Sequence, residues 1–168
     1  MATFGHTTQE AQFNNLGANG TAGLLATSPS DMGTVVSITG YFYDSGGTHT
    51  ETLAIWNYNG SNPTTLVTNS NIAVTVSSSG FFTGTYVTAP VLSANTQYII
   101  GYVSDSVSIF YGANNSSGTN IWDSGNGGVG TWSGGNLVTN FKDATFYVTY
   151  TPSGGTTATR RTLLGVGI

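Results

Sequence analysis

The feature that most constrains this chain is a two-residue alternation of apolar and polar side chains, repeated in one segment after another. In the segment 72–76, Ile72, Val74 and Val76 alternate with Ala73 and Thr75. A β-strand directs successive side chains to opposite faces, so this pattern is typical of a half-buried strand. We find no segment with a helical period. The sequence therefore predicts an all-β fold.

The same alternation predicts which side chains face the core. Gly, Asn, Asp, Ser and Pro residues separate the alternating segments, as expected for turns. About eight or nine short strands in this arrangement predict an antiparallel β-sandwich. The expected strands are 23–27, 34–43, 51–58, 65–68, 72–76, 81–88, 97–104, 107–111 and 144–150. The expected core residues are Val36, Ile38, Phe42, Leu53, Ile55, Ile72, Val74, Val76, Tyr98, Ile100, Tyr102, Phe146, Val148 and Tyr150.

Charge is scarce. Only 6% of the residues are Asp, Glu, Lys or Arg, and the formal net charge is −4. Soluble domains usually carry about 25% charged residues, which help to keep free proteins apart. Their scarcity favours a chain that packs against copies of itself or works outside the cell. With three basic residues and no apolar run long enough to span a bilayer, we expect neither nucleic-acid nor membrane binding.

Two stretches carry a resemblance to known proteins. The first is the turn 28–33 followed by the strand 34–39, and the second is the much later stretch 90–102. In this order they resemble the jelly-roll sandwich domains of phage decoration and tail proteins, and of extracellular carbohydrate-binding or adhesion modules. The resemblance covers about residues 20–150 and implies a jelly roll with a virion or cell-surface role.

Catalytic and metal-binding groups are few and scattered. Four of the seven carboxylates, Asp31, Asp44, Asp105 and Asp123, stand in turn-like contexts, where Asp commonly bonds its own backbone. The two histidines, His6 and His49, are far apart in sequence, and the chain has no cysteine, so a zinc site is not expected. We expect no enzyme and no cofactor. A calcium site built from loop oxygens is the minor alternative.

The segment 112–136 is long, rich in Gly, Asn and Ser, and expected to be a loop. Loops of this length are usually functional or mobile. Tyr111, Trp122 and Trp132 lie in or beside it, and their flat rings could stack on sugars. The other interpretation is that these rings pack as a satellite core or a subunit contact, where Trp and Tyr are enriched.

The last residues form a second distinctive segment. Residues 153–157 read as a flexible linker after the sandwich domain 1–152, in which 1–20 is a candidate N-terminal arm. An apolar segment follows, which could complete its own sandwich or dock on a neighbour by strand addition. The expected assembly contacts are Arg160, Arg161, Leu163, Leu164, Val166 and Ile168.

Together these observations favour a structural virion protein, made in the host cytoplasm. We expect a phage capsid decoration (cement) or tail-associated protein that binds copies of itself, with a trimer as the first guess, and other virion proteins such as the major capsid protein. The alternative is a carbohydrate-binding or adhesion module of an extracellular or tail-fibre protein, with glycans as its ligands.

Overall fold

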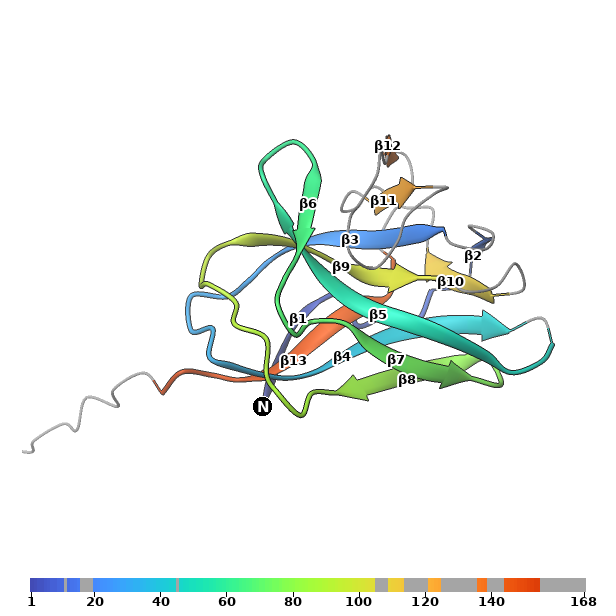
Figure 1. The fold of residues 1–168 in the computed structure, drawn as a ribbon, viewed down its shortest axis with the longest axis horizontal. Coiled ribbons are helices and arrows are strands. Elements are labelled where there is room, and N and C mark those ends of the chain that lie inside the picture. The colour runs from blue at the N-terminus through green and yellow to red at the C-terminus, as the bar shows by residue number, and fades with distance from the viewer. Residues whose placement is uncertain are drawn as a thin grey trace, which may run out of the picture.

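The computed structural model describes residues 1–10, 12–15, 20–44, 46–104, 109–113, 121–124, 136–138 and 144–154. Of strands β2, β10, β11 and β12 and of Asp44, only the backbone is described. This part of the chain is all-β, and its strands form two antiparallel sheets stacked as a sandwich (Figure 1). The strands are β1 (Ala2–Gly5), β2 (Gln12–Asn15), β3 (Thr21–Thr27), β4 (Thr34–Asp44), β5 (His49–Tyr58), β6 (Pro63–Leu66), β7 (Ile72–Val76), β8 (Gly80–Thr85), β9 (Gln97–Val103), β10 (Ile109–Ala113), β11 (Ile121–Ser124), β12 (Asn136–Val138) and β13 (Phe146–Thr151).

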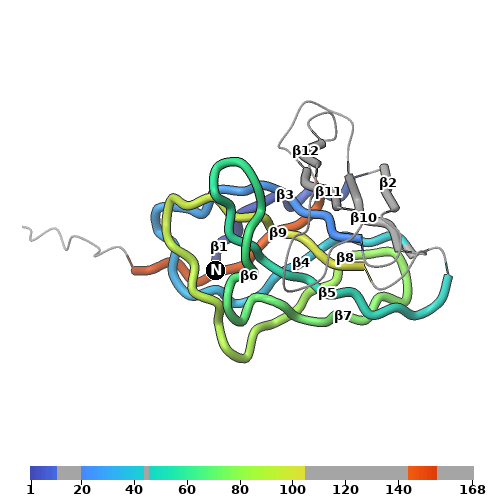
Figure 2. The backbone as a smooth tube through the Cα atoms, turned by 45° about the horizontal axis from the view of Figure 1, so that its top comes forward, coloured from blue at the N-terminus to red at the C-terminus, as the bar shows by residue number. Residues whose placement is uncertain are grey.

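The first sheet, called sheet A here, is built around β4. Its order is β1-β13-β4-β10-β2, and β8 pairs with the other edge of β4. The second sheet, sheet B, has the order β12-β11-β3-β9-β5-β6, with β7 beside β5. Figure 2 shows the same two layers after rotation, with the last described residues after β13 at one end of the sandwich. The antiparallel sandwich predicted from the sequence is confirmed, and its jelly-roll type stays a prediction.

The main core lies between the two sheets and is aromatic at its centre. Phe42 of sheet A lies 5.0 Å from Tyr102 of sheet B and 6.2 Å from Phe146, measured between ring centroids. All three rings are buried. The apolar stripes expected on β7, β9 and β13 all pack into or against this core. Alternation therefore predicted the inward face of these strands correctly.

Sheet B also carries a small apolar cluster on its outer face. Trp56 is fully buried there with Ala54, Ile99 and Val103. Ala54 and Trp56 thus lie on the face of β5 opposite the predicted core residues Leu53 and Ile55, as the two-residue alternation requires.

One expected core residue is wrong. The core residue at the start of β4 is Val35, which is 2% exposed, whereas Val36 is half-buried and lies outside the core. Opposite this point the register shifts, because Thr149 pairs with Ser37 while the next residue pairs with Val35. Val36 is thus the extra residue of a β-bulge, which breaks the two-residue alternation on which the prediction depended.

The nine strands expected from alternation are all present, and four short ones were not expected. They are β1, β2, β11 and β12. The segment 112–136 was predicted as one long loop, but β10 extends to Ala113, β11 lies within the segment and β12 begins at Asn136, so that prediction is wrong at residues 112–113, 121–124 and 136. These strands have only three or four residues, too few to show a clear alternation, and β1, β2 and β11 pair with strands that are distant in the sequence.

Candidate functional site

The predicted assembly contacts Arg160, Arg161, Leu163, Leu164, Val166 and Ile168 lie outside the described residues, as does Trp132. Tyr111 belongs to β10 of sheet A, where it pairs with Phe42 and Asn14. Trp122 belongs to β11 of sheet B, where it pairs with Gly23. The structure thus places Tyr111 and Trp122 on different sheets, and a shared role in sugar binding stays a prediction.

The candidate catalytic and metal-binding groups are dispersed. Asp31 lies in a turn, as expected, whereas Asp123 lies in β11, where its expected turn context is wrong. Asp44 ends β4, and Asp105 lies outside the described residues. Among the residues that the structure describes, no three His, Asp or Glu side chains gather into a group that could hold a metal ion. The same part of the chain contains no helix long and apolar enough to cross a membrane.

A broad surface on the outside of sheet A is the first candidate site. Side chains from β1, β4, β8 and β13 that point away from the core make up this surface, which we call the hydroxyl–aromatic face. Its members are Thr3, Ser37, Thr39, Tyr41, Tyr43, Phe81, Thr83, Thr85, Tyr147 and Thr149. Ser37, Thr39 and Tyr41 of the central strand β4 are buried among their neighbours, and the other seven are half-buried or exposed. None of these ten side chains carries a charge.

Aromatic rings gather at one end of the hydroxyl–aromatic face. The ring of Phe81 lies 4.9 Å from Tyr41 in a T-shaped contact and 6.5 Å from Tyr147. Phe81 is 45% exposed and Tyr43 is 40% exposed, which is high for large apolar side chains. Edge contacts of this kind hold the rings in fixed orientations, so the cluster is a preformed apolar patch in water.

Hydroxyl groups line up across the rest of this face. The strand registers align Thr3 with Thr149, Thr149 with Ser37, and Ser37 with Thr85. Neighbouring strands lie about 4.8 Å apart, so this register makes a regular row of hydroxyls across four strands. In the next row, the Thr39 and Thr83 hydroxyls are hydrogen-bonded at 2.8 Å.

The chain after β1 borders the hydroxyl–aromatic face. Gln9 donates a hydrogen bond from Nε2 to the Tyr41 hydroxyl at 2.8 Å, and the Thr145 hydroxyl donates to the Thr8 carbonyl at 2.7 Å. His6 Nε2 lies 2.6 Å from Glu10 Oε1. Sequence analysis missed this pair because a four-residue spacing signals proximity only in a helix, and this segment is not helical.

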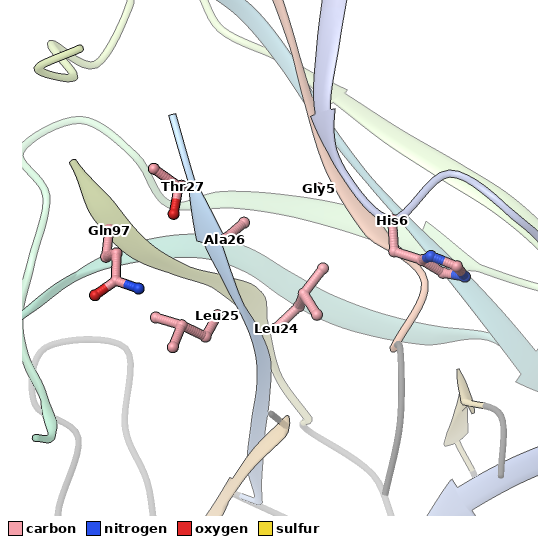
Figure 3. A pocket seen from close by; sticks show the side chains of 7 residues that line it. All are labelled: Gly5, His6, Leu24, Leu25, Ala26, Thr27 and Gln97. Atoms are coloured by element: carbon pink, nitrogen blue, oxygen red, sulfur yellow. The ribbon is translucent and has the colours of Figure 1, made fainter. Parts of the chain in front are cut away.

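The second candidate site is a groove on the open side of the sandwich, between the end of β1 and β3. Its volume is about 330 Å³, and its lining residues are Gly5, His6, Leu24, Leu25, Ala26, Thr27 and Gln97. Figure 3 shows Leu24 and Ala26 on the side of β3 that faces His6, with Leu25 and Thr27 on the opposite side. We call this the β1–β3 groove.

Near the groove, a set of hydrogen bonds fixes the chain as it leaves β13. The Ser153 backbone N–H donates to the Asp31 carbonyl at 2.9 Å, and the Tyr150 hydroxyl donates to Asp31 Oδ1 at 2.8 Å. A Cβ on Gly33 would lie 2.2 Å from the Thr151 carbonyl oxygen, so only glycine permits this close approach. Residues 151–153 are therefore held against the turn that follows β3.

The hydrogen bond to the Asp31 carboxylate raises the pKa of the Tyr150 hydroxyl above its usual value of 10.0. Folding thus favours the protonated phenol, and this stabilisation is full below pH 10 and is lost as pH rises through the folded-state pKa. Because Asp31 is exposed, we expect Tyr150→Phe to lower the unfolding free energy only slightly at pH 7.

Urea denaturation of both proteins at pH 7 and in alkaline buffer checks this prediction. The difference between Tyr150→Phe and the parent protein should shrink above pH 10. Tyr147→Phe is the matched control, because the Tyr147 hydroxyl makes no hydrogen bond to any described residue and it should not reproduce this pH dependence. A difference that stays constant with pH would contradict a role for the Tyr150 hydroxyl.

Comparison with known proteins does not assign a family. No protein-family model matches the chain, and no curated protein or solved structure matches it either.

Proposed function

We propose that this chain is a structural virion protein, a phage capsid decoration or tail-associated protein that stabilises the particle through subunit contacts. The observation that carries the proposal is the hydroxyl–aromatic face, which presents exposed rings and hydroxyls without a charged side chain. The centres of protein interfaces are depleted of charged residues and enriched in aromatic ones. Such a face suits permanent contact with another protein better than free diffusion.

The low charge of the whole chain supports the same proposal. With 6% charged residues, the surface offers little electrostatic repulsion between copies. Burying Phe81 and Tyr43, now 45% and 40% exposed, would stabilise a contact by roughly 1 kcal/mol per ring. Each contact is thus weak alone, and a symmetric particle multiplies it over many copies. We propose a trimer as the unit, bound to the major capsid protein in the virion.

The experiment that tests assembly is the mass of the full-length chain in solution by light scattering, across a concentration series. We expect an oligomer, and we expect Phe81→Asp to shift it towards monomer by about tenfold or more in dissociation constant, because the charge would be buried in the contact. The matched control is Val87→Asp. Val87 is also apolar and fully exposed, and it lies after β8, outside the hydroxyl–aromatic face.

Equal effects of Phe81→Asp and Val87→Asp would show that this face is not the contact. A monomer at every concentration would contradict self-assembly by this face.

The second candidate function is carbohydrate binding. It is favoured by the position of the hydroxyl row beside the exposed rings of Phe81 and Tyr43, because rings can stack on sugar faces while hydroxyls bond to them. Co-sedimentation of the full chain with insoluble neutral polysaccharides tests it. On this alternative Phe81→Asp abolishes co-sedimentation and leaves the mass in solution unchanged.

A further inference from the structure

Among the described residues, part of one edge of strand β3 is unpaired beside the β1–β3 groove. On one side it pairs with β9 over its whole length, from Thr21 to Thr27. On the other side, β11 pairs only with Thr21 to Leu24. Within the described parts of the chain, no strand pairs with Leu25–Thr27 on that side.

The hydrogen-bonding pattern shows which backbone groups this leaves open. In an antiparallel pair, alternate residues exchange hydrogen bonds with the partner strand. The ladder between β3 and β9 is bonded at its ends through Ser28 N–H to the Thr96 carbonyl, at 2.9 Å, and Ser104 N–H to the Gly20 carbonyl, at 2.8 Å. Even-numbered residues of β3 therefore bond to β9. The N–H and C=O groups of Leu25 and Thr27 point the other way, available to a further strand.

The groove beside this edge is apolar on its inner side. Leu24 belongs to the main core, and Ala26 packs against it. Figure 3 shows both side chains directed towards the space between β3 and His6. An added strand would therefore have to place apolar side chains inward, over Leu24 and Ala26. Its outward-facing positions would need no side chain.

One segment of the chain outside the described residues has this pattern. Leu164, Val166 and Ile168 alternate with Gly165 and Gly167. As a strand, this segment directs three apolar side chains to one face and none to the other. It can thus fill the inner side of the groove without a clash on the outer side.

Reach and charge also suit this segment. Ser153 is held on Asp31, and Asp31 follows Thr27 by four residues, so the anchor lies within about 14 Å of the end of the β3 edge. The linker 154–163 can extend to about 33 Å, which covers that distance and also allows an exchange between copies. Arg160 and Arg161 precede the apolar residues and carry positive charge. The Glu10 carboxylate, which is bonded to His6 on the groove wall, carries the opposite charge.

We infer that the β1–β3 groove is the docking site of residues Leu164–Ile168, which add to sheet B as a strand along Leu25–Thr27. Backbone hydrogen bonds to Leu25 and Thr27 fix the strand, and its apolar side chains cover Leu24 and Ala26. This inference rests on the proposed function, because it takes the segment Leu164–Ile168 as an assembly element. It adds the surface that receives this segment.

Disulfide trapping in the full-length chain tests this inference. The sequence contains no cysteine, so each disulfide reports only the introduced pair. The test variants are Thr27→Cys with Gly165→Cys and Thr27→Cys with Gly167→Cys, since outward-facing residues on adjacent strands fit disulfide geometry. The matched control is Thr75→Cys with Gly167→Cys, because Thr75 is equally an exposed threonine on a strand of sheet B, but it lies on β7, outside both the groove and the hydroxyl–aromatic face.

We expect at least one test variant to oxidise about tenfold faster than the control, because adjacent strands hold the thiols at high effective concentration. Adding Val166→Asp to that variant should remove the advantage, since an aspartate cannot enter the apolar side of the groove. Oxidation of both test variants at the rate of the control would overturn the inference.

The mass of the oxidised product separates this result from the fate of the proposed function. A disulfide between two chains supports both the groove and the exchange of arms between subunits. A disulfide within one chain supports the groove while contradicting arm exchange. If both test variants oxidise only at the rate of the control while the full-length chain still forms an oligomer in solution, the groove inference fails. Assembly through the hydroxyl–aromatic face then stands.

Discussion

Replacing Phe42 by Ala should lower the free energy of unfolding by about 4 kcal/mol, close to the upper range for a core aromatic residue. Phe42 is fully buried at the centre of the sandwich. Its ring contacts Tyr102 at 5.0 Å, Phe146 at 6.2 Å and Phe82 at 6.3 Å between centroids. Since Tyr102 belongs to sheet B and the other two to sheet A, the cavity would open where the two sheets meet.

Urea or thermal denaturation, followed by near-ultraviolet circular dichroism, measures this loss. Phe42→Leu retains most of the buried volume and should cost about 1 kcal/mol. Phe81→Ala removes the same ring from β8, where it is 45% exposed, and should cost much less than Phe42→Ala. Equal losses for Phe42→Ala and Phe81→Ala would contradict the central position of Phe42.

The second large effect is expected at Gly101, in the middle of sheet B. A Cβ at this position would lie 1.9 Å from the Ala22 carbonyl oxygen and 2.5 Å from the Gly23 Cα. Both are backbone atoms of β3, which is paired with β9 along its whole length and cannot move locally. Gly101→Ala should therefore destabilise the fold by about 3 kcal/mol, at the upper end for overpacking.

The same denaturation experiment checks this prediction against Gly80→Ala. Gly80 also lies in a strand, but a Cβ there meets only the far end of the Phe82 ring, at 3.9 Å. We expect Gly80→Ala to change stability by less than about 0.5 kcal/mol. A Gly101→Ala protein as stable as the Gly80→Ala protein would show that β3 and β9 can separate without loss.

Both effects bear on function because the candidate surfaces depend on strands that the core holds in register. Tyr41 and Tyr43 of the hydroxyl–aromatic face flank Phe42 on β4. The groove edge lies on β3, which Gly101 contacts directly. A destabilising change at either core position should thus weaken assembly indirectly, and the light-scattering test needs surface variants that leave the fold intact.

The sequence by itself determined the all-β class, nine of the strands and most of the core. On β9, the alternation of Tyr98, Ile100 and Tyr102 was sufficient to place them in the main core, because successive side chains of a strand point to opposite faces. The same argument placed Trp56 on the opposite face of β5 from Leu53. Local side-chain chemistry carries this information.

Only the tertiary structure decided the features that depend on pairing between distant segments. The bulge at Val36 shifts the alternation because β13, more than a hundred residues later, pairs with β4 out of step. The row from Thr3 through Thr149 and Ser37 to Thr85 likewise exists only through the registers of three strand pairs. A pattern within one strand shows which face a side chain takes, but not which residue of another strand lies beside it.

The candidate sites divide in the same way. The apolar alternation of Leu164, Val166 and Ile168 can be read from the chain, because it is local. The edge of β3 that is unpaired among the described residues cannot be read in this way, because it is defined by where the neighbouring strand β11 ends. Sequence alone thus determined the segment that can dock, and tertiary pairing decided where a sheet is open to accept it.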